Sequence, residues 1–104
     1  MTEITRKDGK LELHSGGTTL TLDKSAGTAL LQRKVLFMNK KPLETKLSDI
    51  ADVTVDVAVD RASGVEVCNT MVVTRTGSGW GLSAADKKDA EKTAAAMREF
   101  LGLG

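Results

Sequence analysis

The clearest pattern in the sequence is the stretch VTVDVAV, residues 53–59. Its valines alternate with polar or small residues, and a period of two with β-branched side chains on one side predicts a half-buried β-strand. Asp60 and the sequence RASG at residues 61–64 follow, where the glycine can adopt a positive φ and turn the chain. Residues 65–76 are again rich in β-branched side chains, so residues 53–76 predict a long β-hairpin.

The second arm of this hairpin does not alternate cleanly. Four of its apolar residues share one parity, namely Val65, Val67, Met71 and Val73. Asn69 interrupts this set, and Val72 has the opposite parity. A β-bulge near Cys68 and Asn69 would explain the interruption. An apolar residue on the outer face at Val72 is the alternative.

The N-terminal half repeats the pattern in shorter runs. Leucines alternate with polar residues at 11–14 and at 20–23, and a turn that contains glycine follows each run. Residues 28–37 predict another strand, whose facing stays open because apolar residues occur on both parities. Pro42 marks a loop, since proline cannot donate to a central ladder, and residues 43–47 predict a short strand. Residues 1–9 are expected to be flexible.

The period changes near the C-terminus. Ser83 or Asp86 can cap a helix with acidic residues near its first turn, where the helix dipole favours anions. Four apolar residues recur at steps of four, three and four: Ala90, Ala94, Met97 and Leu101. Gly102 follows the stripe, as is typical of a helix end. We therefore predict a helix at about residues 86–101 that packs this stripe on a sheet.

The order of these elements predicts an α+β fold that is mainly β. About seven antiparallel strands precede a single helix, without the strand–helix–strand alternation of a doubly wound fold. The strands form a bent sheet or small barrel, and the C-terminal helix caps its open end. A chain of 104 residues has the usual size of one domain, so residues 1–104 are assigned to a single domain.

This order of elements resembles the pleckstrin-homology-like (PH-like) fold, as found in small bacterial domains. Three short segments carry the resemblance: LSDI at 47–50, GLSAAD at 81–86 and MREFL at 97–101. The resemblance covers residues 10–102 and implies two orthogonal groups of strands with a capping helix. It also implies a ligand among inositol phospholipids, peptides and other domains. The phospholipid-binding members carry a basic cluster in the loop between their first two strands, and neither loop that corresponds here contains one.

Composition excludes several classes of function. The 15 basic and 14 acidic residues give a net charge of +1, whereas a nucleic-acid-binding domain usually needs a strongly basic face. One cysteine and one histidine provide neither a disulfide nor a zinc site. The polar N-terminus and the lack of a long apolar stretch predict a cytoplasmic protein without a transmembrane segment. No cofactor and no metal are expected.

The residues that most often carry chemistry have structural interpretations in this sequence. His14 ends a strand beside a turn, where an exposed or structural role is expected. Cys68 lies within a strand and is expected to behave as a small buried hydrophobe. The glycine-rich residues 76–81 lack the lysine of a phosphate-binding loop. No catalytic residue is therefore assigned. Asp52, Asp56 and Asp60 share one side of their strand and are expected to protect its edge.

One local excess of positive charge lies within residues 33–46. Its members are Arg33, Lys34, Lys40, Lys41 and Lys46. These residues form either a solvated hairpin tip or a weak contact with an anionic surface or an acidic partner.

The sequence predicts a non-enzymatic binding or interaction module. Such a module uses a sheet edge or residues 33–46 to meet a protein partner or an anionic surface, or it associates with itself. The alternative is a small enzyme or cofactor-binding protein whose site is completed by oligomerisation. A pocket lined by ionisable groups of shifted pKa would favour the alternative, and an open strand edge would favour the module.

Overall fold

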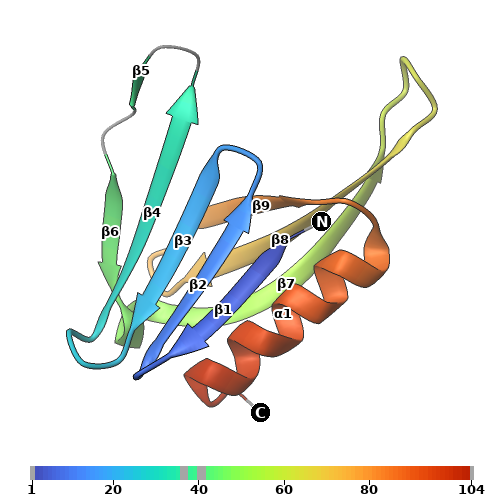
Figure 1. The fold of residues 1–104 in the computed structure, drawn as a ribbon. Helices are drawn as coiled ribbons and strands as arrows, with labels where there is room; N and C mark the ends of the chain where they lie inside the picture. The colour runs from blue at the N-terminus through green and yellow to red at the C-terminus, as the bar shows by residue number, and fades with distance from the viewer. Residues whose placement is uncertain (1, 36–37, 40–41, 104) are drawn as a thin grey trace.

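The chain folds into two antiparallel sheets and one C-terminal helix, and is thus α+β and mainly β, as predicted (Figure 1). The computed structural model describes residues 2–35, 38–39 and 42–103. Within these residues, the first sheet contains β1 (Glu3–Lys7), β2 (Lys10–Ser15), β3 (Thr18–Asp23), β4 (Thr28–Val35), β5 (Met38–Asn39) and β6 (Leu43–Lys46). The second contains β7 (Ile50–Val59), β8 (Glu66–Thr74) and β9 (Gly79–Ala84). The short 3₁₀ helix η1 (Leu47–Asp49) joins the sheets, and α1 (Lys87–Leu101) follows β9.

Strand β1 lies in a segment that was expected to be flexible. It pairs with β2 from Glu3 opposite His14 to Lys7 opposite Lys10. Asp8 and Gly9 connect the two strands, and both have positive φ values, 49° and 77°. An Asp-Gly pair with two positive φ angles is the favoured two-residue hairpin turn, because its twist matches that of the strands. The signal for β1 is therefore the turn, since the strand itself lacks an apolar alternation.

The first sheet directs one face toward the core. Leu11 and Leu13 of β2 and Leu20 and Leu22 of β3 are fully buried, as their alternation predicts. On β4 the sequence left the facing open, and the structure buries Ala29 and Leu31 opposite Leu22 and Leu20. The register with β3 decides this facing, because residues directly opposite one another share a face of the sheet.

The facing of β8 differs from both explanations that the sequence offered. Cys68, Thr70, Val72 and Thr74 are buried and face the core. The pairing of β8 with both neighbours is regular at these residues, and the one register shift of the β7–β8 pair lies between Ile50 and Asp52. Two threonines can face inward because their hydroxyls are bonded; the Thr70 hydroxyl, for example, donates to the carbonyl oxygen of Ala90 at 3.2 Å.

Helix α1 begins and ends where the sequence predicts. Asp86 is the N-cap, and its side chain accepts a hydrogen bond from the N–H of Asp89 at 2.8 Å. Gly102 ends the helix with a left-handed φ of 71°. The buried stripe runs through Ala90, Ala94, Met97 and Phe100, whereas Leu101 is only half-buried. After Met97 the next buried residue is therefore Phe100, three positions later. The predicted step of four would have placed Leu101 in the core.

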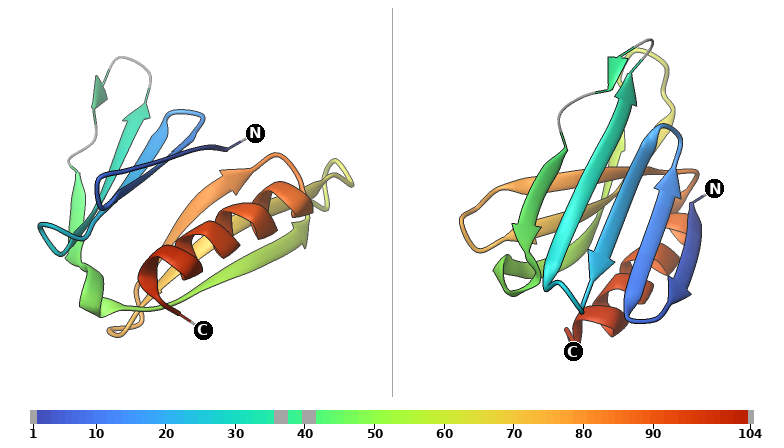
Figure 2. Two further views of the ribbon diagram at one scale, coloured as in Figure 1. Left: turned by 60° about the horizontal axis from the view of Figure 1, so that its bottom comes forward. Right: turned by 60° about the vertical axis from the view of Figure 1, so that its left-hand side comes forward.

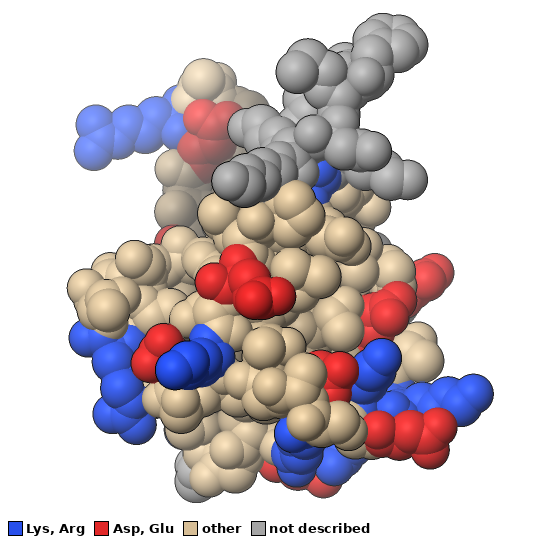
Figure 3. Space-filling model, turned by 90° about the vertical axis from the view of Figure 1, so that its left-hand side faces the viewer, with Lys and Arg blue, Asp and Glu red and all other residues tan. Residues whose placement is uncertain are grey.

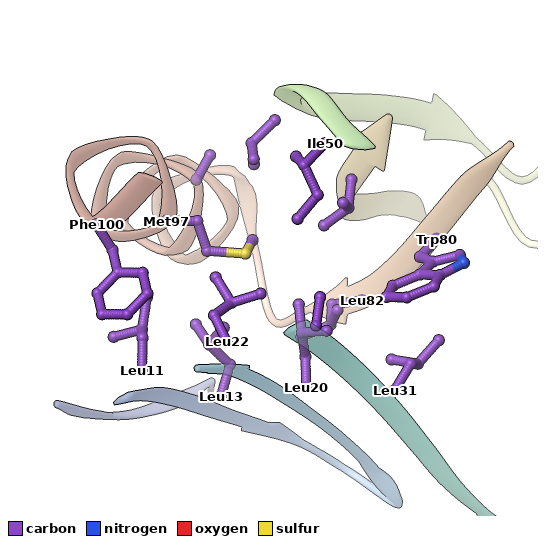
Figure 4. Close-up of a cluster of buried hydrophobic side chains, with 14 residues drawn as sticks. Leu11, Leu13, Leu20, Leu22, Leu31, Ile50, Trp80, Leu82, Met97 and Phe100 are labelled. Carbon is purple, nitrogen blue, oxygen red and sulfur yellow. The ribbon is translucent and has the colours of Figure 1, made fainter. Parts of the chain in front are cut away.

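The core lies between the first sheet on one side and the helix with the second sheet on the other (Figure 2). In Figure 4 Leu11, Leu13 and Leu22 lie beside Phe100 and Met97 of α1 at one end of the cluster, and Leu20 lies beside Leu82 in its middle. Trp80 of β9 and Leu31 of β4 lie at the other end, and both are buried. In the described part of the chain, no helix is long and apolar enough to cross a membrane.

Candidate interaction surface

Exposed apolar side chains gather at one end of the second sheet. Among the described residues, four of the five large hydrophobic side chains that are exposed are valines of the β7–β8 hairpin: Val57 (40% exposed), Val59 (63%), Val65 (59%) and Val67 (44%). They lie in residues 57–67, which we call the distal hairpin. Figure 1 shows that this hairpin extends past the first turn of α1. Val57 and Val59 lie on the core-facing side of the sheet, whereas Val67 lies opposite Ala58 on the outer side, so both faces of this protruding end expose apolar side chains.

The alternation of β7 continues beyond the elements that cover it. Val53 is 2% exposed and Val55 is half-buried, whereas Val57 and Val59 are exposed. Strand β9 ends at Ala84, which pairs with Cys68, and Cys68 lies opposite Val57. Helix α1 begins directly after this point. Val59 therefore continues the core-facing side of the sheet into a region that neither β9 nor α1 covers.

Strand β7 is an edge of the second sheet, and Arg98 closes one part of that edge. In the described residues, β7 pairs only with β8. The Nη1 of Arg98 donates to the carbonyl oxygen of Val53 at 3.0 Å and is also paired with the carboxylate of Asp52. The N–H of Val53 donates to Oδ1 of Asp52 at 2.8 Å. The main-chain groups of Val53 therefore point away from β8 and are satisfied by side chains.

The same edge is open farther along the strand. Alternate residues of a strand direct their N–H and C=O groups to opposite sides. Because those of Val53 point away from β8, those of Val55, Val57 and Val59 do so as well. Residues 55–59 therefore present main-chain donors and acceptors on the side where the described chain places no further strand. We call residues 55–59 the open edge. Its side chains on the core-facing side are the valines whose exposure increases along the strand.

A shallow pocket of about 200 Å³ lies at the Trp80 end of the core. It is lined by Leu43, Glu44, Thr45, Thr74, Thr76, Ser78 and Trp80. Its hydroxyl groups bond mainly within the wall: Thr74 Oγ1 lies 2.9 Å from Thr76 Oγ1 and accepts from the N–H of Ser78 at 3.1 Å. These contacts stabilise the β8–β9 turn and leave Glu44 as the one carboxylate of the pocket.

Of the five basic residues singled out in the sequence, the structure describes the side chains of two, Arg33 and Lys46. Arg33 and Lys46 are both exposed. Arg33 shares its side of β4 with Ala29 and Leu31, whereas Lys46 lies opposite Thr28, on the other face of the sheet. The side chain of Lys34 and both Lys40 and Lys41 lie outside what the structure describes. On the side formed by β6, acidic and basic side chains are interspersed around a mainly uncharged surface (Figure 3).

His14 and Cys68 both have structural surroundings. His14 is half-buried, with Nε2 bonded to the Glu12 carboxylate and Nδ1 3.1 Å from the Thr19 hydroxyl. Cys68 is 3% exposed, and burial, followed by its hydrogen bond to Glu66, raises the pKa of the thiol. A raised pKa disfavours the reactive thiolate. Among the described residues, no three potential ligands gather in a metal site.

Asp89 is a buried acid in the first turn of α1. Its carboxylate is 5% exposed and accepts hydrogen bonds from the Thr2 N–H at 3.1 Å, the Thr2 hydroxyl at 3.0 Å and the Ala85 N–H at 3.0 Å. Burial opposes ionisation, but these donated hydrogen bonds outweigh it and lower the pKa of the carboxyl group. Asp89 lies three residues after the N-cap Asp86, but its carboxylate accepts from the N–H of Ala85, the residue before the N-cap, and therefore does not close a capping box.

Asp89 therefore joins the N-terminal segment to the start of α1. Because its oxygens already accept these bonds, the arrangement points to a structural role. Neither Cys68 nor Asp89 lines the pocket at Trp80, so the pocket does not combine these two ionisable side chains. Comparison with protein-family models, with curated proteins and with solved structures finds no match for the chain.

Proposed function

We propose that the chain is a non-enzymatic interaction module of PH-like architecture that binds an extended protein segment at the open edge of β7. The observation that carries this proposal is the coincidence of two features at residues 55–59. Main-chain groups without a neighbouring strand and valines exposed on the core-facing side occur in the same residues. Strand addition uses these two features, because main-chain hydrogen bonds supply affinity and alternate side chains supply specificity.

The arrangement of elements supports the PH-like part of this proposal. A first sheet is followed by a three-stranded sheet and a C-terminal helix. Figure 1 shows the strands of the two sheets crossing steeply, with α1 along one side of the gap between them. The segments LSDI and GLSAAD, on which the resemblance was based, correspond to the entries into β7 and α1.

The size of the edge limits the affinity. Full burial of a valine contributes about 1.5–3 kcal/mol and a main-chain hydrogen bond about 0.5–1.5 kcal/mol. Association costs about 4–15 kcal/mol in lost freedom of motion. Three valines and a short ladder therefore support a weak complex with a single strand. Asp56 is exposed on the outer face of β7, so a strand with a basic residue opposite it fits best.

A synthetic strand tests this proposal directly. The probe is a seven-residue peptide of alternating lysine and valine with blocked termini, added to the ¹⁵N-labelled protein. We expect the largest changes in amide chemical shift at Val55, Val57 and Val59, because the amide groups of these residues gain acceptors. The control peptide has proline in place of each valine and lacks the donors that strand pairing needs.

Two outcomes would contradict the proposal. One is the absence of shift changes at millimolar peptide. The other is a set of changes of equal size for both peptides, which would indicate a charge contact without strand pairing.

A further inference from the structure

The open edge is symmetric about its central residue. At one end Arg98 closes it by bonding to the carbonyl of Val53. At the other end the chain turns after Asp60, whose N–H donates to the Val65 carbonyl at 2.9 Å. Val57 lies midway, with Val55 two residues before it and Val59 two residues after it. An identical strand that runs in the opposite direction therefore meets the same spacing of donors, acceptors and valines.

We propose that a second copy of this chain occupies the open edge, through antiparallel pairing of two β7 strands about a twofold axis at Val57. This inference rests on the proposed role of residues 55–59 as a strand-binding edge. In this register Val57 lies opposite Val57 of the second copy, and Val55 lies opposite its Val59. The two three-stranded sheets join into one sheet of six strands, which is the isologous contact typical of symmetric dimers.

Charge selects this register over its neighbours. With the axis at Val57, Asp56 lies opposite Ala58 of the second copy, and Thr54 lies opposite its Asp60. A shift of the pairing by two residues in one direction would place Asp56 opposite Asp56, and in the other direction Asp56 opposite Asp60. Like charges directly opposite one another destabilise a strand pair. A shift by one residue would leave the N–H and C=O groups of the two strands without partners directly opposite them. It would also place the valines of the two copies on opposite faces of the joined sheet.

The faces of the two copies also match. A twofold axis perpendicular to the sheet keeps the core-facing side of both copies on one side, so the exposed valines at 57 and 59 form a single row with those of the second copy. The ladder ends where the Val53 carbonyl is already bonded to Arg98, and at this point the strand of the second copy enters its own turn. The closed end of one edge therefore faces the turn of the other.

Cysteine pairing measures the register. The background is Cys68→Ser, which leaves no other thiol. In the proposed register, position 56 of one copy and position 58 of the other form a pair without direct hydrogen bonds, with Cα atoms about 4.5 Å apart and within the range of a disulfide. Two copies of position 56 would lie about 7–8 Å apart, which is too far. Both positions are exposed on β7, so the substitutions do not disturb the core.

The experiment mixes the Asp56→Cys and Ala58→Cys variants in equal amounts, one of them carrying a mass label, under mild oxidation. We expect the mixed disulfide in large excess over both homodimers. A statistical ratio of one to two to one, or an excess of either homodimer, would overturn the proposed register.

Sedimentation of two further variants provides a test without cysteine chemistry. Ala58→Lys places a lysine opposite Asp56 of the second copy at both ends of the ladder, and we expect the dissociation constant of the dimer to fall several-fold. Ala58→Asp places like charges there, and we expect several-fold weaker association. Equal dissociation constants for both variants would overturn the dimer. If the strand peptide still shifts residues 55–59, the edge retains its proposed function and only self-pairing fails; if the peptide has no effect either, both proposals fail.

Discussion

Asp89 shows how one side chain can couple the two ends of the described chain. Its carboxylate accepts from Thr2, 87 residues away, and from Ala85 at the entry of α1. These bonds make the pKa of the carboxyl group lower in the folded state than in the unfolded state. The resulting contribution to the free energy of unfolding is complete above the unfolded pKa of about 3.9, and is lost as the pH falls through the folded pKa.

We predict that Asp89→Asn lowers the free energy of unfolding at pH 7 by about 1–3 kcal/mol, because the amide removes the charge and turns a donor toward other donors. The difference from the wild type should shrink as the pH falls from 7 toward 2. Urea denaturation over this range measures both quantities. Glu91→Gln, at an exposed position of α1, is the control and should have little effect. A difference for Asp89→Asn that does not depend on pH would contradict the electrostatic origin.

At the scale of elements, α1 shows which part of an apolar pattern is buried. Ala90, Ala94 and Met97 follow the predicted stripe, whereas the fourth buried position is Phe100 and not Leu101. The Phe100 ring is covered by two cations, with Lys24 Nζ 4.6 Å and Arg6 Cζ 5.4 Å from its centre. The first sheet therefore decides which residue of the last turn becomes part of the core.

A graded series of aspartates tests this assignment of the helix face. We expect Met97→Asp to reduce the free energy of unfolding by several kcal/mol, because it buries an unpaired charge. Leu101→Asp should have a smaller effect, since Leu101 is half-buried, and Lys92→Asp should remain within about 0.5 kcal/mol of the wild type. Denaturation midpoints rank the three variants. An effect of Leu101→Asp as large as that of Met97→Asp would show that the stripe ends at Leu101.

At the scale of the whole molecule, the net charge is +1, and acidic and basic side chains are interspersed on the face that Figure 3 shows. Arg33 and Lys46, both proposed as contacts for an anionic surface, lie on opposite faces of the first sheet. One flat membrane can therefore contact only one of them closely. Each such contact contributes at most about 1 kcal/mol and is screened within roughly 8 Å at physiological salt.

We predict that co-sedimentation with phosphatidylserine vesicles occurs only at low salt. Of the two single variants Arg33→Glu and Lys46→Glu, we expect one to reduce the bound fraction and the other to leave it unchanged. The expected reduction is about fivefold, which corresponds to one such contact. Arg61→Glu, in the turn of the distal hairpin, serves as the control for a change in net charge alone. Equal reductions by Arg33→Glu and Lys46→Glu would contradict their assignment to opposite faces. If the wild type does not bind the vesicles at low salt, an anionic surface is excluded as a partner.

The sequence by itself determined the features that arise from local patterns. The β7–β8 hairpin follows from alternating valines and a glycine turn, and the bounds of α1 follow from Asp86 and Gly102. The inward leucines of β2 and β3 were predictable for the same reason. These features depend on the conformational preferences of neighbouring residues, which the sequence states directly. A sheet edge was also predicted as a site of interaction, without identification of the strand.

Only the tertiary structure decided the features that depend on residues far apart in the chain. The facing of β8 depends on the contact of Thr70 with Ala90, and the opening of the β7 edge begins where Arg98, 45 residues away, no longer reaches it. The clamp of Asp89 on Thr2 likewise joins segments that no local pattern connects. Burial and hydrogen bonding between distant segments are properties of the packed core, because they depend on which surfaces meet when the sheets and the helix come together.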